Sequence, residues 1–367
     1  MKRILIFGMN QNPGGMESFI MSYFRKIDCS RFQFDFLTNC SQIAYEDEIQ
    51  HLGGQVYKIC ARSQDYKRYR QELTAFFEQH AGEYQAVWMN TCSLANIDYL
   101  KMAKTYGIPC RIIHSHNSQN MDSRLRGVLH HLNKRVIEKY ATEFWACSRL
   151  AGEFFFSPAV INGPHYREIH NAIDCRPYLY DTAVREEMRQ QLQLEDKLVV
   201  GHVGRLHFQK NQAFLLEVFR AVKDEAPNAV LLLVGQGEDE AMLRQKAESL
   251  GITDSVQFLG VRKDVSRLMQ AMDVFLFPSL FEGLGIVLVE AQAAGLGCVT
   301  STEVPADAAM TPLLTALPLS APLEQWARAT LVAAAYPRAS QQEAIAAAGY
   351  DIDTQVRELE SLLEALI

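Results

Sequence analysis

Short apolar runs alternate with longer amphipathic stretches from the beginning of the chain. In the first half, runs rich in β-branched and aromatic residues have the length and composition of strands, and they lie at 3–7, 33–37, 56–59, 86–89, 111–114 and 143–146. Apolar positions at helical spacing predict helices between them, at 15–27, 66–79, 94–105 and 120–141. Such alternation of strand and helix indicates a parallel sheet with helices on both faces.

The pattern stops after residue 174 and then starts again. A polar stretch, 176–197, is interpreted as the connection between two domains. Beyond it, strands are predicted at 198–203, 229–234, 256–259, 274–277 and 298–300, with helices at 211–225, 238–250, 263–271 and 285–294. The sequence therefore predicts an α/β protein of two Rossmann-like, doubly wound domains, 1–175 and 176–367.

Ligands of open α/β sheets bind beyond the carboxyl ends of the strands. Two such domains are therefore expected to face each other across a central cleft that holds the active site. The last amphipathic helix, 353–366, could pack back on the first domain, and the stretch 306–323, rich in Ala, Leu and Pro, receives no assignment.

The composition narrows the location and the chemistry. The chain has 367 residues, of which 48% are hydrophobic, yet its apolar runs fall well short of the ~20 residues that a membrane-spanning helix requires. The eight cysteines include no C-x-x-C pair, which fits a reducing compartment, and metal-ligand spacing is absent. We expect a cytoplasmic protein without a metal or cofactor.

The charge is unevenly distributed. The net charge is −7, with 20 Lys and Arg against 17 Asp and Glu in residues 1–175, and 16 against 26 in residues 176–367. Two basic groups lie in the first half: Lys58, Arg62, Lys67, Arg68 and Arg70, then Arg124, Arg126, Lys134, Arg135 and Lys139. They could meet anionic lipid headgroups or acceptor phosphates, or simply form solvated helix faces. No nucleic-acid partner is expected.

The strongest chemical signal is the segment 277–295, which is predicted to run from a strand through a glycine turn into a helix. Gly283 and Gly285 would let a phosphate approach backbone N–H groups at the helix start. Glu290 lies in an apolar helical run, where a carboxylate needs partners such as the hydroxyls of a ribose. The alternative is that Glu282 caps the helix and Glu290 pairs with a cation.

Three further segments at predicted strand ends offer polar or flexible groups. After the strand at 198–203, Arg205 and Lys210 could neutralise a departing diphosphate, although a structural ion pair and an exposed lysine are the alternatives. Gly14 and Gly15 could lie against a phosphate or simply form a turn. Of the two histidines near the strand at 111–114, His116 is the one expected to reach the cleft, while a structural histidine is the alternative.

Together these segments resemble family 4 of the retaining glycosyltransferases, a large family of GT-B architecture that includes bacterial capsule, exopolysaccharide and lipopolysaccharide enzymes and sucrose synthase. The resemblance covers nearly the whole chain. It is most specific at the E-x7-E element formed by Glu282 and Glu290 within F-P-S-x-x-E-G-x-G.

The resemblance implies roles for individual residues. Arg205 and Lys210 would hold the diphosphate, with Glu282 at the sugar and Glu290 at the ribose. The residues expected to bind the donor are Gly14, Gly15, Gly204, Arg205, Lys210, Gly260, Val261, Glu282, Gly283, Leu284, Gly285 and Glu290, with the backbone of Gly260 and Val261 at the base. His116, Glu282, Arg205 and Lys210 would take part in catalysis.

The activity implied is metal-independent transfer of a sugar, with retention, from a nucleotide diphosphate sugar, UDP by default, to a hydroxyl of a glycan or lipid-linked acceptor in surface polysaccharide synthesis. The location implied is the cytoplasm, including the inner face of the membrane. Two alternatives stay open: a nucleotide-sugar epimerase of the same architecture, and a binding protein without turnover.

Overall fold

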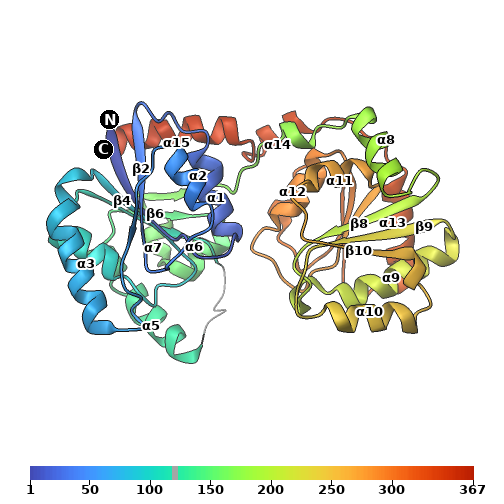
Figure 1. Ribbon diagram of the computed structural model, residues 1–367, viewed down its shortest axis with the longest axis horizontal. Coiled ribbons are helices and arrows are strands. Elements are labelled where there is room, and N and C mark those ends of the chain that lie inside the picture. The colour runs from blue at the N-terminus through green and yellow to red at the C-terminus, as the bar shows by residue number, and fades with distance from the viewer. Residues whose placement is uncertain (118–122) are drawn as a thin grey trace. The chain divides into compact units, whose positions relative to one another are not determined.

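The computed structural model describes residues 1–117 and 123–367, and its described residues form two compact α/β units (Figure 1). The first unit combines residues 1–172 with the C-terminal 352–367, and the second holds 173–351. Residues 173–175, which the sequence analysis assigned to the first domain, belong to the second unit, and the last helix belongs to the first.

The first unit is built on a parallel sheet of seven strands in the order β3-β2-β1-β4-β5-β6-β7. Each of its central strands is buried on both faces, which is why the runs are apolar without strict alternation. The strand order reverses between β1 and β4, so loops that follow these two strands diverge and leave room for a ligand. The strands are β1 (Lys2–Phe7), β2 (Phe32–Thr38), β3 (Val56–Lys58), β4 (Ala86–Thr91), β5 (Cys110–Ser115), β6 (Glu143–Ala146) and β7 (Tyr166–Glu168).

Helices cover both faces of this sheet. They are α1 (Gly15–Phe24), α2 (Glu46–His51), α3 (Tyr66–His80), α4 (Asp98–Thr105), α5 (Arg124–Lys134), α6 (Arg149–Phe155), α7 (Pro158–Ile161) and α15 (Ile352–Leu366). Several begin at a capping side chain: the carboxylate of Asp65 accepts from a backbone N–H of α3, and the hydroxyls of Ser123 and Ser148 do the same for α5 and α6.

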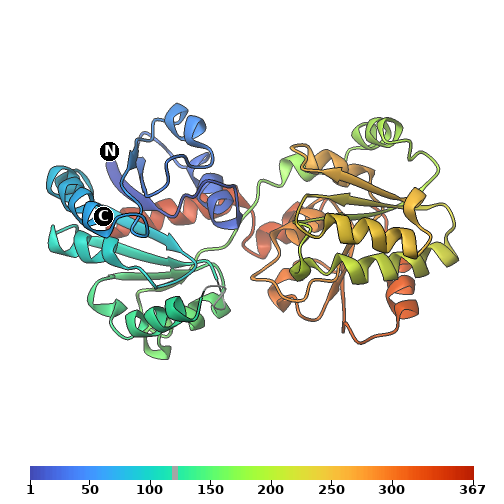
Figure 2. The ribbon, with the colours of Figure 1, turned by 60° about the horizontal axis from the view of Figure 1, so that its bottom comes forward.

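The C-terminal helix α15 completes the first unit. Figure 2 shows it, in red, lying along this unit. Its apolar face, including Val356, Leu359 and Leu363, joins the core around β1 and β2. An ion pair of 2.7 Å between Lys2 and Glu364 links the two ends of the chain.

The second unit is built on a parallel sheet of six strands in the order β10-β9-β8-β11-β12-β13. Numbered within the unit, this is the Rossmann order 3-2-1-4-5-6, which reverses between β8 and β11. The strands are β8 (Leu198–Val203), β9 (Ala229–Val234), β10 (Val256–Gly260), β11 (Val274–Phe277), β12 (Gly297–Ser301) and β13 (Leu314–Leu317), and the helices are α8 (Thr182–Gln191), α9 (Gln212–Glu225), α10 (Glu240–Ser249), α11 (Val265–Ala271), α12 (Ile286–Ala293), α13 (Leu323–Ala334) and α14 (Gln342–Ala347).

The predicted α/β class and doubly wound sheets are confirmed, with differences at individual elements. The predicted helix 120–141 is divided, because α5 ends at Lys134 and a short 3-10 turn, Ile137–Lys139, follows; residues 118–122 lie outside the described ranges. The unassigned stretch 306–323 contains the 3-10 turn Ala306–Ala308 and strand β13, which pairs with β12. β13 escapes prediction because it is short and only half-buried.

None of the helices in the described ranges is long and apolar enough to cross a membrane.

Candidate functional site

In the second unit, two loops meet where the strand order reverses. The first follows β8 and the second follows β11, and hydrogen bonds join them directly. The side-chain amide of Gln209 donates to the carbonyl of Phe281 at 3.0 Å, and the backbone N–H of Leu280 donates to the carbonyl of Gln209 at 2.8 Å. Asn211 Nδ2 also donates to the carbonyl of Pro278 at 3.2 Å. The two loops therefore form one braced surface at the carboxyl edge of the sheet.

A partly buried ion pair lies on this surface. Lys210 Nζ is 2.6 Å from Glu282 Oε1, and the two side chains are 18% and 7% exposed. The ammonium also lies 4.8 Å from the ring centre of Phe277, within reach of a cation–π interaction. Glu282 does not cap the following helix, since Gly285 occupies the N-cap without a side-chain cap bond. The structure thus brings Lys210 and Glu282 together.

Glu290 lies on α12, between one and two turns beyond the glycine loop, and is partly buried. Its carboxylate accepts a hydrogen bond from the hydroxyl of Tyr178, which lies in the 3-10 turn Arg176–Tyr178. Burial raises the pKa of Glu290 to about 7, and the Tyr178 hydrogen bond opposes that rise. Among the described residues, no cation forms an ion pair with Glu290, so the alternative of a structural ion pair finds no partner.

Arg205 forms an ion pair of its own, separate from the pair of Lys210 and Glu282. Its side chain is 67% exposed, and its guanidinium lies 3.0 Å from Glu238 Oε2. Glu238 follows β9 and also lies 3.4 Å from His207 Nε2. Glu238 was missed by the sequence analysis, although the adjacent glycines at 235 and 237 mark a loop at a strand end.

Three glycines lie together at the ends of neighbouring strands. A Cβ on Gly235 would stand 2.0 Å from the carbonyl oxygen of Gly204, so these two loops touch through their backbones. The N–H of Gly235 donates to the carbonyl of Gly260 at 2.8 Å, and Gly260 has a φ of +63°. The side chain of Val261, next in sequence, is exposed. This arrangement places Gly204, Gly260 and Val261 along one edge of the sheet.

The glycine loop before α12 divides its residues between core and surface. Gly285 has a φ of +77°, and an added Cβ would lie 3.3 Å from Phe277. Leu284 is buried in the core of the second unit, so only its backbone could contact a ligand, whereas Gly283 is exposed. The backbone N–H groups at the start of α12 point out of the helix end, where partial positive charge favours an anion.

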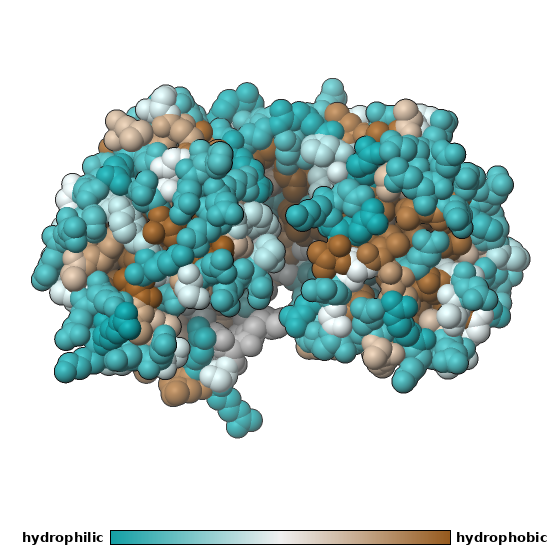
Figure 3. Space-filling view, viewed as in Figure 1, coloured by the Kyte–Doolittle hydropathy of each residue, from teal (hydrophilic) through white to brown (hydrophobic). Residues whose placement is uncertain are grey.

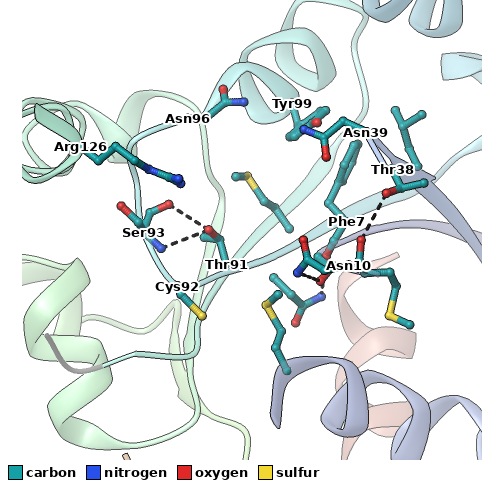
Figure 4. Close-up of a pocket in the computed structure, with 16 residues that line it drawn as sticks. Phe7, Asn10, Thr38, Asn39, Thr91, Cys92, Ser93, Asn96, Tyr99 and Arg126 are labelled. Carbon is teal, nitrogen blue, oxygen red and sulfur yellow. Dashed lines mark hydrogen bonds between the residues drawn. The ribbon is translucent and has the colours of Figure 1, made fainter. Parts of the chain in front are cut away.

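The first unit holds a pocket of about 320 Å³ at its own reversal point, beyond β1 and β4. Figure 4 shows that amide and hydroxyl groups surround it and that the guanidinium of Arg126 points toward it. Thr91 Oγ1 accepts from the N–H of Ser93 at 3.2 Å, which orders one wall. Its polar lining includes Asn10, Thr38, Asn39, Asn90, Thr91, Ser93, Asn96 and Arg126.

The two histidines on β5 and just beyond it differ in exposure. His114 is fully buried, and Trp88 Nε1 donates to its Nδ1 at 3.2 Å. His116 is partly exposed, and its Nε2 lies 2.9 Å from Oδ1 of Asn90. Since Asn90 Nδ2 donates to the carbonyl of Phe7, its Oδ1 accepts the proton of His116 Nε2. Burial lowers the pKa of His116 to about 3, so its ring is neutral.

Gly14 and Gly15 begin α1 in the same unit. Gly14 is the N-cap, without a side-chain cap bond, and a Cβ there would meet the carboxylate of Glu17 at 2.8 Å. Glu17 is buried and accepts from Asn10 Nδ2 at 2.7 Å. Neither glycine lines the pocket. The close approach of Glu17 explains why a glycine stands at position 14, and the contacts of both glycines with a ligand stay a prediction.

Within residues 1–117 and 123–367, no three His, Cys, Asp or Glu side chains gather in a group that could hold a metal ion.

Comparison with known proteins identifies the family. A Bacillus subtilis (strain 168) protein that bears the name glycosyltransferase EpsF is 34% identical over 369 residues, which span 97% of this chain and 94% of that protein. The chain belongs to the group 1 glycosyltransferases. The sequence model described as "Glycosyl transferases group 1" matches residues 184–309, a range that contains Lys210, Glu282 and Glu290. Membership in a family of transferases decides against the epimerase and the scaffold alternatives.

Two further likenesses agree with this family. The UDP-Gal:alpha-D-GlcNAc-diphosphoundecaprenol alpha-1,3-galactosyltransferase of Escherichia coli is 34% identical over 109 residues, or 29% of this chain and 28% of that enzyme. The Anabaena protein HepE, solved in complex with UDP and glucose, superimposes with a TM-score of 0.76 at 22% identity, with 100% of both chains covered. The chain whose two units are described above therefore has the GT-B fold.

Proposed function

We propose that this glycosyltransferase moves a sugar from a UDP-sugar onto a hydroxyl of a glycan or lipid-linked acceptor during surface polysaccharide synthesis, with retention of configuration and without a metal ion. The single observation that carries the proposal is the pairing of Lys210 with Glu282 at the reversal point of the second sheet, with Glu290 on the helix that follows. The UDP complex of HepE and the UDP-Gal donor in the name of the E. coli relative support UDP as the nucleotide.

In this proposal the donor lies along the carboxyl edge of the second sheet. The diphosphate would bind Lys210 Nζ and the backbone at 283–285, where the start of α12 favours an anion. The ionised Glu290 would accept hydrogen bonds from the ribose hydroxyls, and Glu282 would accept from a hydroxyl of the sugar. The backbone of Gly260 and Val261 would face the base.

Arg205 must change partner to reach the diphosphate. Its bond to Glu238 joins two largely exposed side chains, and such pairs contribute little to stability because solvent screens them. A diphosphate, which carries more charge and accepts two parallel hydrogen bonds, would therefore compete well for the guanidinium. With Lys210 and Arg205 both on the diphosphate, the charge that a divalent metal neutralises elsewhere would be balanced by the protein.

Transfer would break the bond between the anomeric carbon and the diphosphate oxygen and form a bond from that carbon to the acceptor oxygen on the same face. The departing phosphate would take the proton of the acceptor hydroxyl, so atoms and charge balance without a protein base. The neutral ring of His116 lacks the extra proton of an imidazolium, so it would act near the sugar as a hydrogen-bonding group and not as a general acid.

The pocket of the first unit suggests what the acceptor presents there. Its lining is rich in side-chain amides and hydroxyls, which match the donors and acceptors of sugar hydroxyls, and Arg126 is the cation among its residues. We therefore propose that a sugar of the acceptor occupies this pocket. A lipid-linked acceptor would place the enzyme at the inner face of the membrane, in peripheral contact through the basic first domain.

A thermal-shift panel tests the donor half of the proposal. The protein is heated in EDTA with UDP, ADP, GDP or dTDP, and then with individual UDP-sugars. A ligand of the native state raises the melting temperature by mass action. UDP and at least one UDP-sugar are expected to stabilise the protein in EDTA. If another nucleotide alone stabilises it, or if a divalent metal is needed, the proposed donor or the metal-free site is wrong.

A further inference from the structure

We propose that α5 of the first unit is a membrane-docking helix that lays exposed apolar side chains into an anionic lipid surface. The inference rests on the proposed function, because a lipid-linked acceptor would have to be met at such a surface. It goes beyond that function by naming one helix as the contact.

Three apolar side chains on one face of α5 are exposed to solvent. Leu125, Val128 and Leu132 are 70%, 57% and 53% exposed, and they stand at positions i, i+3 and i+7, which is one face of a helix. The opposite face packs inward through Gly127 and His130, which are buried. Single exposed apolar residues are ordinary, but three in a row along one helix face form a patch that calls for a partner.

A set of cations lies beside this face. Arg124 and Arg135 flank it, and among the described residues neither forms an ion pair with a carboxylate. Lys134 donates to the carbonyls of Glu153 and Phe154, which satisfies its hydrogen bonds while leaving its charge in place. Among the residues that the structure describes, the acids near these cations are Glu138 and Glu153, and Glu153 pairs with Arg149. A basic helix with an exposed apolar face is the form taken by helices that lie in a membrane interface.

The other basic group of the sequence analysis differs in this respect. Lys58 pairs with Glu46 at 2.6 Å, Arg62 approaches Asp98 at 3.7 Å and Arg68 pairs with Glu72 at 2.6 Å. Most of its charge is therefore balanced locally. The structure thus separates two groups that look alike in sequence and favours α5 as the lipid contact. Figure 3 shows apolar and hydrophilic surface side by side at the lower edge of this unit, where Figure 1 places α5.

The position of α5 links this surface to the pocket. Arg126, one residue beyond Leu125, lines the pocket of the first unit, and Figure 4 shows its side chain pointing toward it. A lipid-linked sugar whose head occupied that pocket would therefore have its lipid close to the exposed face of α5. An anionic membrane is the occupant that satisfies both the apolar side chains and the cations.

Vesicle co-sedimentation tests the inference. The full-length protein is mixed with phosphatidylcholine vesicles with or without one third phosphatidylglycerol. The variants are Arg124→Gln/Arg135→Gln and Leu125→Gln/Leu132→Gln, and the matched control is Lys67→Gln/Arg70→Gln, which removes the same charge from the other basic group. Arg126 is left unchanged because it lines the pocket.

Wild type and control should co-sediment with the anionic vesicles and stay in the supernatant with the neutral ones. Added salt should weaken the binding to anionic vesicles. The arginine variant should partition roughly 10- to 30-fold less, since each of its two basic residues near an anionic surface contributes about 1 kcal/mol. The leucine variant should lose at least roughly 10-fold, because its apolar side chains no longer enter the lipid. Failure of wild type to bind, or an equal loss in control and α5 variants, would overturn the inference. Stabilisation by UDP, measured on the same samples, should be unchanged in every variant, so failure of docking and failure of the proposed donor site are distinguishable.

Discussion

Lys210 Nζ lies 2.6 Å from Glu282 Oε1, and the carboxylate is almost wholly buried. In the proposed donor complex these two groups serve different parts of one ligand, the diphosphate and the sugar. The ion pair would then hold the ammonium near the position where it is needed while the site lacks the donor. Binding would replace the Glu282 carboxylate with the diphosphate as the partner of Lys210. Substitutions of Lys210 and of Glu282 should therefore affect UDP affinity differently.

Replacing Lys210 by Gln should weaken UDP binding roughly 10- to 100-fold, the loss expected for a charge-assisted hydrogen bond to a phosphate. Calorimetry with UDP measures it. Glu282→Gln should leave UDP affinity unchanged or stronger, because a competing negative charge disappears. Its transfer rate from the UDP-sugar should fall roughly 10-fold or more, since the sugar loses its carboxylate partner. Parallel losses of UDP affinity in the two variants would contradict the division of roles.

Glu290→Gln should weaken UDP binding above pH 7, because an amide replaces the carboxylate that accepts from the ribose. The wild type should itself lose UDP affinity as the pH falls through about 7, where Glu290 becomes protonated. Titration of the terminal phosphate of UDP, whose second pKa is about 6, affects both proteins alike, so the ratio of the two affinities isolates Glu290. Calorimetry between pH 6 and pH 8 gives both curves, and an equal pH dependence in wild type and variant would remove Glu290 from the ribose.

The same side chain makes a separate prediction about stability. The folded-state pKa of Glu290, about 7, exceeds its ordinary value of 4.5, so folding favours the protonated form. The cost of burying the carboxylate is absent below pH 4.5, grows as the pH rises to 7 and is complete above it. Relative to Glu290→Gln, the wild type should lose about 1–3 kcal/mol of stability across this window. Denaturant unfolding of both proteins measures the difference between their free energies of unfolding at each pH. The buried histidines are present in both proteins, so their titration does not affect this difference. A difference that stays constant with pH would show that the pKa of Glu290 is not raised.

Gly285→Ala should destabilise the second unit by about 1–2 kcal/mol, because its φ of +77° suits glycine and the new Cβ would approach Phe277. Gly283→Ala is the matched control, since an added Cβ there meets open space. Its melting temperature should stay near that of the wild type. Equal melting temperatures for the two variants would show that the loop adapts to a side chain at 285.

Gln292→Ala should cost about 2–4 kcal/mol of unfolding free energy. Gln292 is buried in α12; its amide donates to the carbonyls of Leu288 and Ala308, and its oxygen accepts from the N–H groups of Met310 and Thr311. Removing it leaves several buried polar groups without partners. Urea denaturation measures the loss, and a loss below 1 kcal/mol would mean that 308–311 finds other partners.

The sheets could be predicted because their strands are continuous apolar runs. The predicted strands 198–203, 229–234 and 274–277 coincide with β8, β9 and β11, which are buried on both faces. Short edge strands could not be predicted. Tyr166–Glu168 and Leu314–Leu317 contain no buried residue, so no continuous apolar run marks them as strands.

Some features of the candidate site could likewise be predicted from the sequence, and others could not. The positions of Lys210 and Glu282 beyond strand ends could be predicted, whereas their contact depends on β8 and β11 being neighbours in the sheet, an order that the apolar pattern does not give. The pairing of Arg205 with Glu238 depends on a third loop and on side-chain direction, which spacing along the chain does not encode. The raised pKa of Glu290 likewise depends on how closely α12 is covered, an effect that the hydrogen bond from Tyr178 opposes.

Release of UDP from UDP-sugars in the presence of EDTA is the most direct test of the central claim. Each UDP-sugar is incubated with wild type or Lys210→Gln, with and without a membrane lipid extract as the source of acceptor. The account predicts UDP release by the wild type from at least one UDP-sugar, dependent on the extract and unaffected by EDTA, and little release by the variant. Release that requires a divalent metal, or that is equal in the variant, would contradict it.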